Sequence, residues 1–182
     1  SKKPVNIRMS AMIIAFLVII SVTALWLIPT AAPSLAQMVP LSWERGLKNM
    51  VLKQITANHR VCREKSIHHI LQQIADKLQS NAQSPPVSIT LIESDIVNAF
   101  ALPANHMVLF TQFIKEAESP EELAGVMAHE MGHAAHHHVM ENVIRYVGVS
   151  GIIDVASGGA GTMLYLMFEL YHNSYSREKE RE

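Results

Sequence analysis

The pattern of hydrophobic and polar positions begins with a long apolar segment in which polar side chains do not recur at a regular spacing. From residue 9 to residue 28 the sequence contains no charged side chain. Twenty such residues match the length of a helix that crosses a bilayer. The pattern therefore predicts an N-terminal transmembrane anchor over 9–28. A cleaved signal segment is the alternative interpretation, with Ser34-Leu35-Ala36 as its small-x-small cleavage site.

Positive charges precede this apolar run. Lys2, Lys3 and Arg8 lie before it, and no further positive charge occurs until Arg45. Because positive residues favour the cytoplasmic side of a membrane, we expect residues 1–8 to form a cytoplasmic tail. The rest of the chain would then lie in the periplasm, or otherwise outside the cytoplasm, attached to a bacterial inner membrane by one helix.

Two helical segments are predicted after a linker over 29–42 that is rich in Pro, Ala and Ser. Apolar side chains recur every three or four residues within 43–58, and again within 66–78. Ser42 stands where a residue that caps the first of these helices would be.

Between residues 87 and 110 the helical spacing gives way to strand-like segments. The segment 87–92 alternates in the manner of a strand, and 97–102 and 106–110 are similar short runs. Pro103-Ala104-Asn105 is typical of a turn between the last two. We therefore expect an α+β fold that is mostly helical, with a small three-stranded sheet.

Residues 119–141 have the pattern of a further helix with a strong start signal. Ser119 can cap it, Pro120 fits its first turn, and Glu122 completes a capping box. Apolar positions at helical spacing follow, and we expect the helix to continue to Glu141.

This helix contains H-E-x-x-H, a pattern typical of zinc proteases. His129 and His133 are one turn apart, so both imidazoles project from one side and can hold one Zn²⁺ while leaving room for a third ligand and a water. Glu130 is rotated by about 100° around the axis, where it can take a proton from that water. The pattern predicts a zinc hydrolase with Glu130 as its base. A solvated histidine-rich face, or a histidine-rich metal buffer, is the alternative.

The spacing leaves the third ligand open. His137 would stand about 12 Å along the helix axis from His129, too far for one tetrahedral ion. We expect His136, His137 and His138 to pack, to face solvent or to support the ligands. The downstream candidates are Asp154, Glu169, His172, Glu178, Glu180 and Glu182.

Composition adds two exclusions. The net charge is −1, so no overall field favours nucleic acid as a partner. The single Cys62 provides no disulfide framework.

Residues 143–168 are apolar but interrupted by glycines, which indicates a helical hairpin or mobile lid; a second membrane span is the alternative.

Several motifs resemble those of the HtpX, BepA and CAAX-prenyl-protease family of membrane-linked zinc metallopeptidases, peptidase family forty-eight. They are NAFALPANH, SPEELAGVMAHEMGH and SREKERE, and the similarity extends from about Trp43 onward. The resemblance implies a zincin-like domain over 43–182 and one zinc ion held by His129, His133 and Glu180. The SREKERE stretch stops amid charges, so we expect the chain to be part of a longer protein.

The resemblance also implies a function and a mode of substrate binding. We expect an endopeptidase that cleaves misfolded or membrane-associated proteins, as in envelope quality control. An inactive or latent metal-binding chaperone of the same fold is the alternative. The substrate would add as a strand to the sheet edge next to the metal. The residues expected to form that edge are Asn98, Ala99, Phe100 and Ala101. The sequence does not indicate an oligomeric state.

Overall fold

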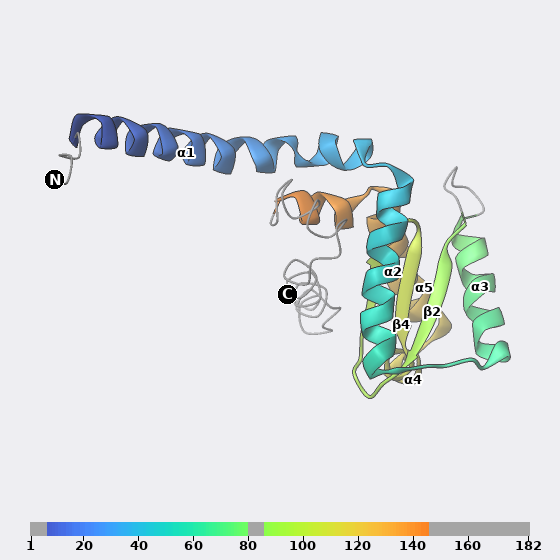
Figure 1. Ribbon diagram of the computed structural model, residues 1–182. Helices are drawn as coiled ribbons and strands as arrows, with labels where there is room; N and C mark the ends of the chain where they lie inside the picture. Colours follow the sequence, from blue (N-terminus) through green and yellow to red (C-terminus); the bar gives the residue numbers. More distant parts are fainter. Residues whose placement is uncertain (1–6, 80–85, 146–182) are drawn as a thin grey trace.

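The computed structural model describes residues 7–79 and 86–145 and arranges them as helices around one small mixed sheet (Figure 1). The predicted lid over 143–168, apart from 143–145, lies outside the described residues, and so does Glu180. Residues 138–145 are helical. The elements are α1 (Ile7–Met38), α2 (Leu41–Asn58), β1 (Arg60–Val61), α3 (Lys65–Gln79), β2 (Ser88–Glu93), β3 (Ala99–Leu102), β4 (His106–Phe110), α4 (Thr111–Glu116) and α5 (Pro120–Ala135).

Helix α1 points away from the sheet as one long helix (Figure 1). It includes the predicted span over 9–28. Within residues 7–79 and 86–145, however, no helix combines the length and the apolar character that a membrane crossing requires, so the predicted transmembrane helix is not confirmed. The large apolar side chains of α1 that are 53% to 66% exposed are Met9, Met12, Ile13, Ile14, Phe16, Val18, Ile19, Val22 and Leu27.

The predicted linker over 29–42 is helical for most of its length. Helix α1 continues to Met38, although it contains Pro29 and Pro33. A proline inside a helix removes one hydrogen bond and disfavours the helix. Ala32 and Ala36 offset this because both are buried against the core, at 0% and 1% exposure. Tertiary packing therefore overrides a composition that is typical of a linker.

The sheet has four strands in the order β1-β2-β4-β3, one more than the sequence predicts. Strand β2 is parallel to β4, whereas β1 and β3 each pair antiparallel with their neighbour. The extra strand, β1, pairs Arg60 with Glu93 and Val61 with Ile92. Two residues are too few to show an alternating pattern, so β1 could not be predicted. The order places β3 at one edge of the sheet.

A tight turn joins β3 to β4 at the predicted position. Ala104 and Asn105 both have left-handed backbones, with φ of 59° and 50°. Asn tolerates this region better than most residues, whereas Ala does not. The Ala104 N–H donates a 2.9 Å hydrogen bond to Oε2 of Glu44, a buried carboxylate on α2. This contact between distant segments helps to fix the turn behind the edge strand.

Two hydrophobic clusters cover the two faces of the sheet. On one face α2, the end of α1 and residues 138–145 pack against β3 and β4; on the other face α3, α4 and α5 pack against the same strands. Helices α2 and α5 accordingly lie on opposite sides of the sheet in Figure 1. Strands β3 and β4 are buried at every position. The sheet is therefore the middle of three layers, and α5 is held beside the edge strand.

A buried histidine links the two parallel strands. His106 on β4 lies within hydrogen-bond distance of two hydroxyls on β2: its Nδ1 is 2.6 Å from Ser88 Oγ and its Nε2 is 2.9 Å from Thr90 Oγ1. Burial lowers the pKa of His106 to about 4, with a smaller contribution from the charge of Lys48. This imidazole is therefore neutral at physiological pH and serves as a structural link.

The helix caps agree only in part with the sequence. Ser42 was predicted to cap α2, but the helix begins at Leu41 and its cap is Pro40, which makes no side-chain hydrogen bond. The Pro40 carbonyl instead accepts hydrogen bonds from the N–H groups of Trp43 and Glu44. A proline holds φ near −65° and so suits the residue at which the chain enters a helix. Ser42 consequently lies inside the first turn.

Candidate metal centre

The start of α5 forms as the sequence predicts and orients the helix. Ser119 Oγ accepts a 3.1 Å hydrogen bond from the Glu122 N–H, and Pro120 occupies the first turn. The Glu122 carboxylate accepts from the N–H of Glu118, one residue earlier than a standard capping box would have it. The face formed by Leu123, Val126 and Met127 is buried in the core. The other side of α5 is thus left for the H-E-x-x-H side chains.

The two histidines of this motif converge. Nε2 of His129 lies 3.1 Å from Nε2 of His133, and the rings are nearly perpendicular. Two nitrogens bound to one tetrahedral zinc at about 2.05 Å would stand roughly 3.3 Å apart. Burial lowers the pKa of His133, and the neighbouring His129, His138 and His136 lower it further. A neutral imidazole is the form that binds a metal.

Glu130 reaches across to the edge strand. Its Oε2 accepts a 2.9 Å hydrogen bond from the N–H of Ala101 on β3. Burial raises the pKa of Glu130 to about 7, while this hydrogen bond acts in the opposite direction. A carboxyl with a pKa near neutrality suits a general base, because it can both take and return a proton. The sequence predicts that Glu130 is the base, but it does not predict the hydrogen bond between Glu130 and β3.

Helix α5 ends before the predicted boundary at Glu141. It stops at Ala135; His136 is its cap, and His137 is left-handed with φ of 55°. The prediction that the helix continues through His137 to Glu141 is therefore wrong. Instead Nδ1 of His138 lies 2.8 Å from Nδ1 of His133. Three consecutive histidines contain no helix-breaking residue, so no local pattern predicts this turn.

The residues predicted to bind substrate all lie at or next to β3. The Asn98 carbonyl accepts from Phe110 N–H and so faces β4. Main-chain groups alternate along an antiparallel strand, so those of Ala99 and Ala101 face away from β4. The Asn98 and Phe100 side chains are buried, at 1% and 8% exposure. An added strand could therefore pair only with main-chain groups of β3, whose residues are all buried.

Comparison with known proteins agrees with this geometry. The profile of Peptidase family M48 matches residues 62–182. The chain is 26% identical over 147 residues to the Beta-barrel assembly-enhancing protease of Yersinia pestis, covering 74% of this chain and 30% of that protein. It is 31% identical over 114 residues to Protease HtpX of Legionella pneumophila subsp. pneumophila, covering 61% and 39%. The Mitochondrial metalloendopeptidase OMA1 of Arabidopsis thaliana is 40% identical over 57 residues, which cover 31% of this chain and 12% of that protein.

The chain belongs to peptidase family M48. The resemblance inferred from its motifs is thereby confirmed, and with it the assignment to the metallopeptidases. The chain spans about a third of the length of the first two of these curated relatives, and the match to the third covers 12% of it. The match includes α5 and also Glu180, the third ligand implied by the resemblance.

Two side chains of this M48 domain, His129 and His133, are arranged as ligands of one zinc ion would be. Two imidazoles with converging Nε2 atoms are typical zinc ligands. Within residues 7–79 and 86–145 no cluster of three or more His, Cys, Asp or Glu side chains is arranged to hold a metal. Glu180, the third ligand that the resemblance implies, lies outside the described residues.

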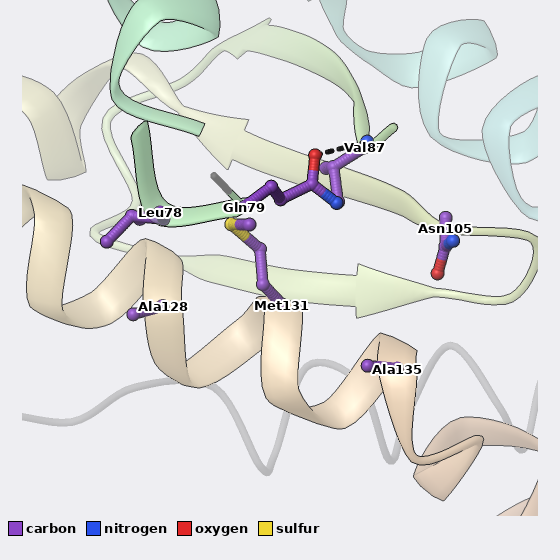
Figure 2. Close-up of a pocket in the computed structure, with 7 residues that line it drawn as sticks. All are labelled: Leu78, Gln79, Val87, Asn105, Ala128, Met131 and Ala135. Atoms are coloured by element: carbon purple, nitrogen blue, oxygen red, sulfur yellow. Dashed lines mark hydrogen bonds between the residues drawn. The ribbon is translucent and has the colours of Figure 1, made fainter. Parts of the chain in front are cut away.

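A cavity of about 150 Å³ opens on a face of α5 other than the one that carries His129 and His133 (Figure 2). The α5 side chains in its wall, Ala128, Met131 and Ala135, form a stripe rotated away from His129 and His133. In Figure 2 Gln79 extends toward Val87, whose N–H donates to Gln79 Oε1 at 3.2 Å. This mostly apolar cavity lies between α3, α5 and the β3–β4 turn, and it is separate from the metal centre.

Proposed function

We propose that this chain is a zinc-dependent endopeptidase in which His129 and His133 hold the ion through Nε2. The 3.1 Å approach of these two atoms is the observation that supports the proposal most directly. Glu180 is the proposed third ligand, because it occupies the position of the glutamate in the family's S-R-x-x-E pattern. One zinc ion per chain would then be bound by two imidazoles and one carboxylate.

Glu130 is the proposed base. When bound, zinc polarises the scissile carbonyl and makes a water more acidic. Glu130 accepts the proton of that water on its other oxygen, Oε1, while Oε2 stays on the Ala101 N–H, and the oxygen of the water bonds to the scissile carbonyl carbon. As the peptide bond breaks, the same carboxyl gives the proton to the leaving amine nitrogen. The products are a carboxylic acid and an amine, and the carboxylate of Glu130 is restored.

Cleavage of casein by the zinc-loaded full chain, compared with the Glu130→Gln and His133→Ala variants, tests this function. Loss of cleavage in both variants supports the proposal, because one change removes the base and the other a ligand. Cleavage that survives either substitution refutes it.

The substrate would bind as a strand added to the edge of β3 that faces away from β4. The Ala101 N–H is already bound by Glu130, so the next outward main-chain groups are those of Ala99. Ala99 is 1% exposed, so the substrate would have to displace what covers this position. Hydrogen bonds between main chains do not depend on the substrate's side chains, so we expect broad sequence preference.

Substitution of Ala99 by Pro tests this edge. Proline removes the outward N–H without removing a hydrogen bond to β4. We expect kcat/KM for a long peptide to fall by about tenfold, the effect of losing one hydrogen bond of about 1.4 kcal/mol. Ala99→Gly, which keeps the N–H, is the matched control. Equal activity of the two variants would exclude strand addition at Ala99.

We also propose that α1 attaches the protease to a lipid bilayer. Its exposed apolar side chains, such as Phe16 and Ile19 at 63%, are stabilised by leaving water. Lys2, Lys3 and Arg8 support attachment to a bacterial inner membrane with the catalytic domain in the periplasm. The substrates we propose are misfolded or membrane-associated proteins, in line with the relative named as a Beta-barrel assembly-enhancing protease.

Alkaline extraction of membranes tests the attachment. We expect the full chain to stay in the membrane pellet, because hydrophobic attachment resists high pH. Replacing Phe16 and Ile19 together by Lys should release part of it, whereas Lys at the polar position Ser42 should not. Complete release of the unaltered chain would contradict the proposal.

A further inference from the structure

The turn that ends α5 has an unusual backbone for its sequence. His137 is left-handed, with φ of 55°, and the chain is helical again from 138 to 145. A residue other than glycine rarely adopts this region and persists there where its surroundings enforce it. The contacts around the turn show what enforces it.

One buried carboxylate fixes this turn from outside the helix. Glu44 on α2 is 4% exposed, and its Oε1 accepts a 3.0 Å hydrogen bond from His137 Nδ1. Its Oε2 accepts from the N–H of Ala104 in the β3–β4 turn. The two left-handed turns, one after α5 and one behind the edge strand, are therefore bound to the same side chain. We call Glu44, Ala104 and His137 the carboxylate clamp.

The clamp determines where the next side chain lies. Beyond the turn, His138 folds back so that its Nδ1 is 2.8 Å from Nδ1 of His133. His136 stacks on the His138 ring with centroids 5.5 Å apart and planes 24° from parallel. In a continuous helix, residue 138 would follow residue 133 by five positions and would face a different direction. The break at His137 is thus what brings the two rings together.

His133 therefore has a partner for each ring nitrogen. Its Nε2 faces Nε2 of His129, and its Nδ1 faces His138. An imidazole that binds a metal through Nε2 has its proton on Nδ1, and an acceptor for that proton fixes both the tautomer and the ring orientation. An imidazole with its proton on Nε2 has a lone pair on Nδ1, so Nδ1 of His138 can be that acceptor.

We propose that His138 is a positioning residue for the metal centre: it accepts the Nδ1–H of His133 and so aims Nε2 of His133 at the zinc ion. The carboxylate clamp places His138 for this purpose. The inference rests on the proposed zinc-binding function, and it adds a role for a side chain that is neither a ligand nor the base.

Zinc affinity of His138 variants tests the proposal on the full chain. We expect His138→Ala to weaken zinc binding by about 10- to 100-fold in competition with a chelator, as loss of a ligand's supporting partner typically does. His138→Asn should restore most of the affinity, since its Oδ1 can stand near the position of Nδ1. His136→Ala, which removes the stacked ring but leaves the hydrogen bond between His133 and His138, is the matched control and should stay close to the unaltered chain.

Absorption of the cobalt(II)-substituted protein provides a second measurement. We expect the ligand-field bands to shift in His138→Ala and to return in His138→Asn. Unchanged affinity and spectrum in His138→Ala would overturn the inference while leaving the zinc endopeptidase intact. Equal weakening in the Ala and Asn variants would also overturn it, because the acceptor would then be irrelevant. If the unaltered chain binds no zinc, the proposed function itself fails.

Discussion

Replacement of Glu130 by Gln is expected to lower kcat/KM for casein cleavage by about 10³-fold, within the range by which general bases accelerate reactions. The amide can still accept the Ala101 N–H bond that Glu130 makes, so the local fold is retained. It cannot take a proton from water. The measurement is initial cleavage rates at matched zinc content, with thermal unfolding as a check on stability.

The same variant separates the protease from a chaperone of the same fold. A protease loses its effect on a client protein along with cleavage, whereas a chaperone keeps an aggregating client soluble after cleavage is lost. If Glu130→Gln cleaves casein at the unaltered rate, the assignment of Glu130 as the base is wrong.

The pH dependence of the unaltered chain provides a further check on this residue. Burial raises the pKa of Glu130 to about 7 in the metal-free protein. The positive charge of bound zinc favours the carboxylate and lowers that pKa. The base must be ionised to act, so kcat/KM should fall as the pH is lowered through a value below 7, and the fall should have a slope of one proton.

The second large effect is expected from His133→Ala. We expect zinc affinity to fall by at least about 100-fold, since loss of a group that merely supports a ligand already costs about 10- to 100-fold. Casein cleavage should disappear with the metal. Plasma emission spectroscopy of dialysed protein gives the zinc content, and one tightly held ion per unaltered chain is expected.

His69→Ala is the matched control for the number of metal ions. Its imidazole is exposed on α3 and belongs neither to the H-E-x-x-H pair nor to the carboxylate clamp, so the chain should keep its single zinc. A histidine-rich metal buffer would instead bind several ions weakly and lose a fraction of them in each variant. Graded losses of that kind would contradict a single zinc centre.

Local patterns predicted the parts of the site that a single helix determines. The capping signal at Ser119 and the four-residue spacing of His129 and His133 depend on neighbours in the sequence, and the structure has both as expected. The edge position of the strand at 99–102 also agrees with the expectation.

The parts that could not be predicted depend on contacts between distant segments. The bond between Glu130 and Ala101 spans 29 residues, and the contact between Glu44 and His137 spans 93. The left-handed turn at His137 contains no glycine or asparagine that would predict it. The carboxylate of Glu44 on another helix holds this turn in place. Periodicity and propensity describe only near neighbours and therefore extended α5 through this turn.

The packing of Ala32 and Ala36 determines where a shortened version of this protein can begin. Both side chains belong to the same apolar cluster as Leu47 and Val51 of α2. A fragment that starts at Leu41 would expose that cluster to solvent and would be prone to aggregate. The last turns of α1 are thus part of the globular unit, and material for crystallisation should start upstream of Ala32.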